Sequence, residues 1–326
     1  MTEQSNNDEL IREIDPAMAG LRLDHCLQQI FSEYSRARLQ KWVKEGKITI
    51  DGRLLRSKDK VFGGETIILI PEVEAQERWQ PEAIDLDIVY EDAAVIVLNK
   101  PAGLVVHPAA GNQQGTLLNA LLHHAPELNE MPRAGIVHRL DKETTGLMVV
   151  ARTLTAQKTL VEQLQARTVT REYFALVMGT IIAGGTLEWP IGRHRVDRKR
   201  MAVVDDGKPA MTHYRVLERY AHHTYLKVNL STGRTHQIRV HFSHMNHPLI
   251  GDPVYGGRLR IPKQANDELA NCLRGFRRQA LHAGRLKFEH PLTRDSVEFS
   301  RPVPKDMEDM LNIMREHNPV QPVIRK

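Results

Sequence analysis

A compact group of charged and polar residues lies between two short apolar runs near the middle of the chain. The runs are residues 136–137 and 147–150, and Asp141 and Glu143 lie between them. We predict that both runs are strands of a buried sheet, which would place Asp141 on a connection at a rigid sheet edge, where catalytic groups are often found. A carboxylate held there can be aimed at a substrate. Alternatively, both acidic residues only form a turn, because Asp, Thr and Gly stabilise turns through local hydrogen bonds.

The chain has the length and composition of a folded protein with more than one domain. Its 326 residues are 41% hydrophobic and 26% charged, which allows a substantial core and two domains. The sequence contains no apolar run of about 18 residues, the length that a membrane helix needs. Its N-terminus is polar and acidic, without the basic and apolar regions of a signal peptide. We therefore predict a cytoplasmic protein without a membrane segment.

Neither a disulfide nor a metal site is indicated. Cys26 and Cys272 lie in segments with a helical pattern and lack the Cys-x-x-Cys or Cys-His spacing of a zinc site. We predict that both are buried free thiols. A group of histidines could suggest a metal, but acidic and thiol ligands are sparse around it, so we predict no metal. The histidines are His236, His241, His244 and His247.

The excess of positive charge is small, so its distribution matters more than its size. There are 45 Lys and Arg residues against 40 Asp and Glu residues, a net charge of +5, which permits nucleic-acid binding but is weak evidence for it. The run 193–200 follows Gly192 and is dense in guanidinium groups, so it could be a mobile loop that grips phosphates. A solvated charge run is the alternative. The cluster of Arg274, Arg277 and Arg278 allows the same two interpretations.

Residues 20–71 have the pattern of a small separate domain. Its first predicted helix has one apolar face, and its second is amphipathic and basic. Asp51-Gly52 would supply the positive φ angles of a tight hairpin turn. The predicted elements are a helix over 21–31, a helix from a Ser35 N-cap to Gly46, a hairpin over 47–55 and a strand over 65–70. The basic side chains of the second helix include Arg36, Arg38 and Lys41.

Residues 85–315 are predicted to form a larger α+β domain around a mixed, mainly antiparallel sheet. Strand and helix patterns do not alternate strictly, which argues against a doubly wound parallel sheet. Residues 1–19 are predicted to be a flexible N-terminus, 72–84 a linker and 316–326 a C-terminal tail. The predicted strands are 88–90, 94–98, 104–106, 136–137, 147–150, 173–177, 225–230 and 235–242, and the predicted helices are 116–123 and 155–166.

Three motifs of the larger domain, taken together, resemble those of RNA pseudouridine synthases. They are Lys-Pro-x-Gly within 99–108, Arg-Leu-Asp-Lys-x-Thr-Thr-Gly-Leu within 138–147, and Gly-Arg-Thr-His-Gln-Ile-Arg within 232–241. The match is to the ribosomal large-subunit branch, and residues 248–256 resemble the continuation of its third motif. The small domain resembles the S4 RNA-binding domain that precedes the catalytic domain in that branch. The tail shows no clear match.

The resemblance implies that uridines in a stem-loop of 23S rRNA are isomerised to pseudouridine, with an essential aspartate and no cofactor. Asp141 matches this aspartate, which either attacks the sugar at C1′ or removes a 2′ proton. Arg234 matches the arginine that pairs with it, and a guanidinium close by would hold the carboxylate ionised. Tyr173 matches the tyrosine that stacks on the base and could move a proton. Taken alone, Arg234 could be a surface arginine and Tyr173 a core residue.

The target uridine must leave its helix stack before C1′ is reachable, so an aromatic face and positive surroundings are expected around it. Arg139 is predicted to occupy the space that the base vacates. The other predicted contacts to RNA are His138, Lys142, Thr144, Lys100, His107, Arg195, Arg198, Arg200, Arg36, Arg38 and Lys41.

Two other functions compete with this one. A non-catalytic rRNA-binding assembly factor would not need Asp141, and a nucleoside or glycoside hydrolase would need a second carboxylate flanking the bond, for which Glu143 in the same turn is poorly placed. The expected partner is 23S rRNA or the assembling large ribosomal subunit. No obligate protein partner is evident, and a monomer is the default expectation.

Overall fold

The computed structural model describes residues 9–32, 34, 36–71, 79–109, 111–198 and 200–317. The chain divides into two compact units, residues 1–78 and 79–326. Residues 72–78 of the predicted linker and the predicted N-cap Ser35 lie outside the described residues. In the described part of the chain, no helix is long and apolar enough to cross a membrane.

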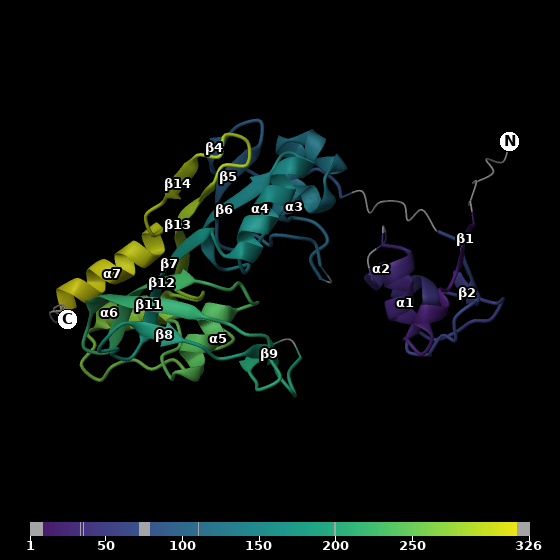
Figure 1. The fold of residues 1–326 in the computed structure, drawn as a ribbon. Coiled ribbons are helices and arrows are strands. Elements are labelled where there is room, and N and C mark those ends of the chain that lie inside the picture. Colours follow the sequence, from purple (N-terminus) through teal and green to yellow (C-terminus); the bar gives the residue numbers. More distant parts are fainter. Residues whose placement is uncertain are drawn as a thin grey trace. The chain divides into compact units, whose positions relative to one another are not determined.

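The first unit combines two helices with a three-stranded antiparallel sheet (Figure 1). The helices and strands share one apolar core, in which Leu27, Phe31, Trp42 and Ile67 are almost completely buried. The elements are β1 (Leu10–Glu13), α1 (Leu23–Ile30), α2 (Arg36–Lys44), β2 (Ile48–Ile50) and β3 (Thr66–Leu69), and the sheet order is β1-β3-β2.

Two predictions for this unit need correction. The flexible N-terminus predicted over 1–19 was wrong for its described residues, because β1 pairs with β3 and Ile14 is completely buried, and residues 1–8 lie outside the described residues. The predicted hairpin was also wrong in part. Asp51 and Gly52 do adopt positive φ angles of 48° and 74°, and Ile50 forms a bridge with Arg53. However, beyond this single bridge β2 pairs with β3, and the paired residues Ile50 and Ile67 both face the core.

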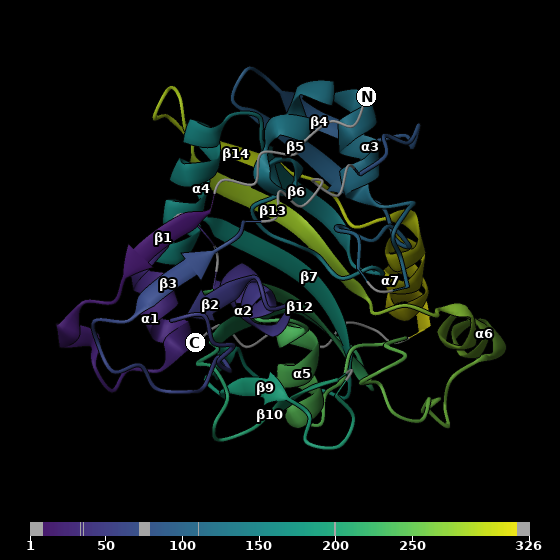
Figure 2. The ribbon, with the colours of Figure 1, turned by 90° about the vertical axis from the view of Figure 1, so that its right-hand side faces the viewer.

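The second unit is built on a nine-stranded mixed sheet. Its central strands lie side by side in Figure 2. Among the named strand pairs of this sheet, β6 and β13 are parallel and the others are antiparallel. The order is β4-β5-β6-β13-β7-β12-β11-β8, with β14 also paired to β13. The strands are β4 (Ile88–Glu91), β5 (Val95–Lys100), β6 (Thr145–Ala151), β7 (Thr170–Met178), β8 (Gly185–Leu187), β11 (Thr212–Arg219), β12 (His223–Leu230), β13 (Leu281–Glu289) and β14 (Ser296–Ser300).

Helices and a small hairpin complete this unit. Thr116 caps α3 by accepting a hydrogen bond from the Asn119 backbone, as its position before an apolar helical run suggests. The remaining elements are α3 (Leu117–His124), α4 (Leu154–Ala166), α5 (Gln237–His244), α6 (Asp267–Gly275), α7 (Lys305–His317), and the two-stranded sheet of β9 (Ile191–Arg193) and β10 (Met201–Val203).

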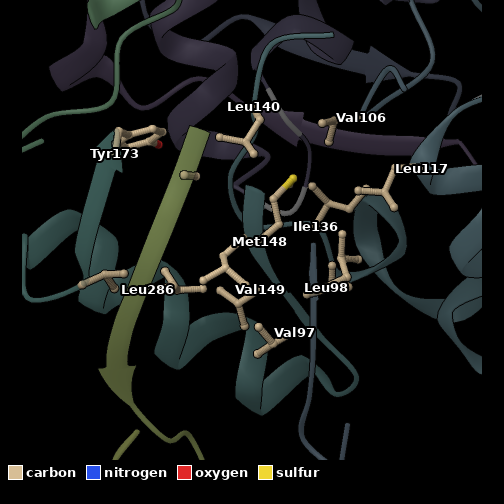
Figure 3. Packing of buried hydrophobic residues seen from close by; sticks show 14 of the residues in the cluster. Val97, Leu98, Val106, Leu117, Ile136, Leu140, Met148, Val149, Tyr173 and Leu286 are labelled. Atoms are coloured by element: carbon tan, nitrogen blue, oxygen red, sulfur yellow. The ribbon is translucent and has the colours of Figure 1, made fainter. Parts of the chain in front are cut away.

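The core explains why the central strands have continuous apolar runs. β6 is buried along its whole length, and the four apolar residues that begin β5 are completely buried. Figure 3 shows Val97 and Leu98 of β5 beside Met148 and Val149 of β6. Strands covered on both faces have no solvent side that would require polar residues. The connection that carries Asp141 therefore leads directly into one of the most deeply buried strands of the sheet.

Three predicted strands are wrong. Residues 136–137 and 104–106 form only isolated bridges, from Ile136 to Val150 and from Val105 to Thr116. Residues 235–242 were predicted to be a strand because polar and apolar residues alternate there, but residues 237–244 form α5. The alternation misleads because Gln237, Arg239 and His241 are all buried and hydrogen-bonded inside the protein. It therefore does not mark a buried and a solvated face.

Candidate active site

The turn that carries Asp141 is held in place by a buried lysine. Lys100, at the end of β5, is completely buried, and its ammonium donates hydrogen bonds to the carbonyl oxygens of Pro101 (2.7 Å), Leu104 (2.9 Å) and Lys142 (2.9 Å). Burial lowers the pKa of Lys100 to about 8, although nearby Glu143 and Asp141 act in the opposite direction. The predicted contact between Lys100 and RNA was wrong, because three protein carbonyls occupy its donors.

Thr144 also has a structural position in this turn. Its backbone N–H donates to the carbonyl oxygen of Asp141 (3.0 Å), and its buried hydroxyl accepts a hydrogen bond from the Gln279 side chain (3.0 Å). The chain then enters β6. With Lys100 holding the neighbouring carbonyl, the backbone around the carboxylate is fixed on both sides.

Arg239 of α5 is the ion-pair partner of Asp141. Its Nη1 donates to Asp141 Oδ2 at 2.9 Å, and the side chain of Arg239 is 6% exposed against 16% for Asp141. The predicted pairing with Arg234 was wrong: Arg234 lies five residues earlier, and its Nε donates to the carbonyl oxygen of Pro209 (3.1 Å). Both arginines belong to the third motif. Only the helix that begins between them decides which one reaches the carboxylate.

A second carboxylate orients Arg239. Asp252 accepts two hydrogen bonds from it, from Nε at 2.7 Å and from Nη2 at 2.9 Å. Burial alone would raise the pKa of Asp252, but the guanidinium of Arg239 lowers it overall. Asp252 also accepts from the backbone N–H groups of Val254 and Tyr255. This bidentate pair fixes the plane of the guanidinium and leaves Nη1 to point at Asp141.

Tyr255 lies under the same guanidinium. Arg239 stacks over its ring at 5.0 Å, and Arg200, which immediately precedes β10, stacks over it at 5.2 Å. Its hydroxyl accepts a hydrogen bond from the Met201 backbone (2.9 Å) and is 2.8 Å from His236 Nδ1. The basic segment 193–200 is thus part of a hairpin that contacts residues around the carboxylate.

Asp141 opens into a cavity of about 570 Å³. Tyr173, on the central strand β7, lines it and is 6% exposed. Burial raises the pKa of Tyr173, and the negative charge of Asp141 adds to this effect. Among the described residues that line the cavity, Asp141 is the single carboxylate. Glycoside hydrolysis requires two carboxylates that flank one bond, so this lining does not favour a hydrolase.

The cavity is rich in arginine. Sequence reasoning predicted some of these residues and missed others. Two of the missed residues, Arg133 and Arg167, have left-handed backbones with φ angles of 57° and 62°. Non-glycine residues in this conformation are strained and concentrate at functional sites, a signal visible only in the structure. The lining arginines are Arg133, Arg139, Arg167, Arg171, Arg234 and Arg239.

The other predicted contacts are scattered. His138 and Arg139 line the cavity, and Thr144 also reaches it. His138 accepts a hydrogen bond from the Val149 backbone (3.1 Å), and burial lowers its pKa to about 3.

The remaining predicted contacts lie outside the cavity lining. Three of those in the second unit are exposed: Lys142, Arg195 and Arg198. His107 packs edge-on against Trp79, at 5.7 Å between ring centroids. Arg36, Arg38 and Lys41 are exposed on α2 of the first unit.

The site is an arginine-lined cavity in which Asp141 is the single carboxylate among the described lining residues, a combination suited to an anionic substrate such as nucleic acid. A family model described as RNA pseudouridylate synthase matches residues 94–244. Ribosomal large subunit pseudouridine synthase D of Pseudomonas aeruginosa is 56% identical over 304 residues, which cover 93% of this chain and 95% of that protein. The protein of the same name from Escherichia coli O157:H7 is 51% identical over 308 residues, 94% of each chain.

Solved structures agree with these matches. Human RNA Pseudouridylate Synthase Domain Containing 4 is 27% identical with a TM-score of 0.55, over 70% of this chain and 92% of that chain. Human RNA Pseudouridylate Synthase Domain Containing 1 is 26% identical with a TM-score of 0.55, over 75% of this chain and 92% of that chain. The chain belongs to the RNA pseudouridine synthase family and is an enzyme of that class.

Proposed function

We propose that the protein converts specific uridines of 23S rRNA, in a stem-loop of the large ribosomal subunit, into pseudouridine. The observation that carries this proposal is the Asp141 carboxylate, which is paired with Arg239 at 2.9 Å inside the cavity. The choice of RNA follows from the relatives, which are named as ribosomal large subunit synthases and match over almost the whole chain.

The reaction needs no external reactant. The C1′–N1 bond breaks, the base turns, and a C1′–C5 bond forms, while C5 loses a proton and N1 gains one. Asp141 would either attack C1′ or remove a 2′ proton to start this sequence. Arg239 holds it in place by an ion pair and a hydrogen bond. No atom is oxidised, so the reaction calls for no redox cofactor.

The walls of the cavity suit a nucleotide that has left its helix. We place Tyr173 against the uracil ring and Arg139 in the space that the base vacates, because both line the cavity with Asp141. Arg133 and Arg167 add positive charge for the neighbouring phosphates. The substrate itself would be rRNA during subunit assembly in the cytoplasm, bound by a monomer.

The first unit would add to the grip on RNA as an S4-like domain. Its α2 exposes basic residues, including Arg36 and Lys41, and phosphate contacts of this kind raise affinity without reading sequence. We expect binding to weaken steeply with salt, in proportion to the number of phosphates contacted.

The test is pseudouridine mapping of rRNA from cells that lack the gene, complemented with wild-type protein or with Asp141→Asn. We expect particular 23S sites to disappear and only the wild-type protein to restore them. The variant should be at least about a thousandfold slower on purified rRNA, because the reaction loses its carboxylate. Unchanged modification with defective subunits would instead indicate an assembly factor, and release of free uracil would indicate a hydrolase.

A further inference from the structure

His236 is a strained residue beside the catalytic carboxylate. It precedes α5 with φ 56° and ψ 21°, in the left-handed region that non-glycine residues rarely adopt. Its ring lines the cavity, and its Nε2 lies 3.7 Å from Asp141 Oδ1. That distance is too long for a good hydrogen bond. A residue is held in such a conformation only when its surroundings fix it, and this is characteristic of functional positions.

The contact of the other ring nitrogen favours one tautomer of the neutral histidine. His236 Nδ1 is 2.8 Å from the Tyr255 hydroxyl, which already accepts the Met201 N–H at 2.9 Å. If the hydroxyl donates its own proton to Nδ1, the hydroxyl, Nδ1 and the Met201 N–H each have a hydrogen-bond partner. The neutral ring then carries its proton on Nε2, the nitrogen that faces Asp141.

Burial keeps this ring neutral near pH 7. It lowers the pKa of His236, and Arg239 and Arg139 act in the same direction, while Asp141 and Asp252 oppose them. The result is an oriented N–H group at the edge of the cavity, next to the one oxygen of Asp141 that Arg239 does not bind.

We propose that His236 donates this Nε2–H hydrogen bond to the 2′-oxygen of the target uridine and thereby selects ribose over deoxyribose. This rests on the proposed function for the identity of the RNA and for the reaction of Asp141 at the sugar. Whether Asp141 attacks C1′ or removes a 2′ proton, the C1′–C2′ edge of the sugar must lie against it. The 2′-hydroxyl on that edge is then close to a donor 3.7 Å from the carboxylate. It is also the group that distinguishes RNA from DNA.

Tyr255 is the positioning residue in this arrangement. Its hydroxyl holds the histidine in one protonation form, and its ring stacks under the guanidinium that pairs with Asp141. Tyr255→Phe removes the hydroxyl and keeps the ring. It therefore separates loss of the proposed orientation of His236 from loss of the packing around Arg239.

The test is a rate comparison on two synthetic RNA stem-loops built around one mapped target uridine. They differ only at that nucleotide, which is either a ribonucleotide or its 2′-deoxy form. We would measure single-turnover rates for wild type, His236→Ala, Tyr255→Phe and, as a matched control, His123→Ala, whose side chain is exposed at the end of α3. Thermal unfolding of each full-length variant shows whether it folds.

We expect wild type to prefer the ribose substrate and His236→Ala to lower the ribose-to-deoxyribose rate ratio by about tenfold, the size expected for one hydrogen bond. Tyr255→Phe should lower the same ratio by a few-fold, and His123→Ala should leave it unchanged. Equal losses on both substrates would overturn the proposal, because a purely structural histidine cannot sense the 2′-oxygen. Equal rates of the wild-type protein on the ribose and deoxyribose substrates would also overturn the proposal. If mapping finds the target in another RNA, the rRNA assignment fails and the same pair of substrates is built around that uridine.

Discussion

The two units of the molecule each contain a carboxylate surrounded by arginine, and the two carboxylates differ in what their oxygens contact. In the first unit Asp24 is 1% exposed and accepts hydrogen bonds from Arg22, Arg36 and Gln40, so that both of its oxygens are occupied. In the second unit Asp141 is 16% exposed and receives one hydrogen bond from Arg239 on Oδ2, while Oδ1 faces His236 at 3.7 Å.

We infer that this difference separates a structural acid, Asp24, from the acid that we propose to be reactive, Asp141. A carboxylate whose lone pairs are all occupied by protein donors is held in place, because any new contact must replace an existing one. In the second unit, the structural role falls to Asp252, which holds Arg239 with two hydrogen bonds. Asp141 can then share that arginine and keep one oxygen for the substrate.

The difference between Asp24 and Asp141 is tested most strongly at Arg239, which Asp141 shares with Asp252. We expect Arg239→Gln to lower the single-turnover rate on rRNA by about a hundredfold or more, because it removes the positive charge beside the reactive carboxylate and leaves Asp252 buried without its partner. Arg234→Gln is the matched control from the same motif, since its guanidinium contacts Pro209, and it should cost less than about tenfold. Equal losses in the two variants would contradict the assignment of Arg239.

A smaller effect is expected when the structural acid is removed. Asp24→Asn should destabilise the first unit by about 1 to 3 kcal/mol, because donors of Arg22 and Arg36 lose a charged acceptor. Hydrogen exchange of α1 and α2 in the full chain measures this change. The rate on a bound RNA stem-loop at saturating enzyme should stay within about twofold. A large fall in that rate would show that Asp24 contributes to the reaction itself.

The smallest expected effect is the pH dependence of the same interaction. Burial alone would raise the pKa of Asp24, but its hydrogen bonds with Arg36, Arg22 and Gln40 lower it well below the ordinary value of 3.8. A carboxylate with a lowered pKa contributes stability above the unfolded pKa and loses it as the pH falls toward the folded value. The hydrogen-exchange difference between wild type and Asp24→Asn should therefore be constant from about pH 7 to 5 and shrink below about pH 4. A difference that is already lost at pH 5 would be inconsistent with a strongly lowered pKa.

Local sequence was sufficient wherever the controlling interactions were also local. The apolar runs within β5 and β6 are buried, residues 117–123 of the predicted helix are helical, and Asp51 and Gly52 take positive φ angles. Each of these features depends on neighbours within a few residues or on a run of uniform hydrophobicity. The three motifs likewise identified the family, and the apolar run over 147–150 placed Asp141 on a connection beside a buried strand.

The tertiary structure alone decided which residues complete the site. The segment that becomes α5 alternates polar and apolar residues like a strand. Its polar side chains can nevertheless be buried, because they form hydrogen bonds with residues that lie far away in sequence. Arg239 reaches Asp141 across 98 positions and Asp252 across 13, and His241 bonds the Trp189 carbonyl. Lys100 is buried rather than bound to RNA because carbonyls of two separate turns converge on it. Sequence thus determined the family and the candidate aspartate, whereas the ion pair of that aspartate with Arg239 and the contact between His236 and Tyr255 depend on long-range contacts that no local pattern encodes.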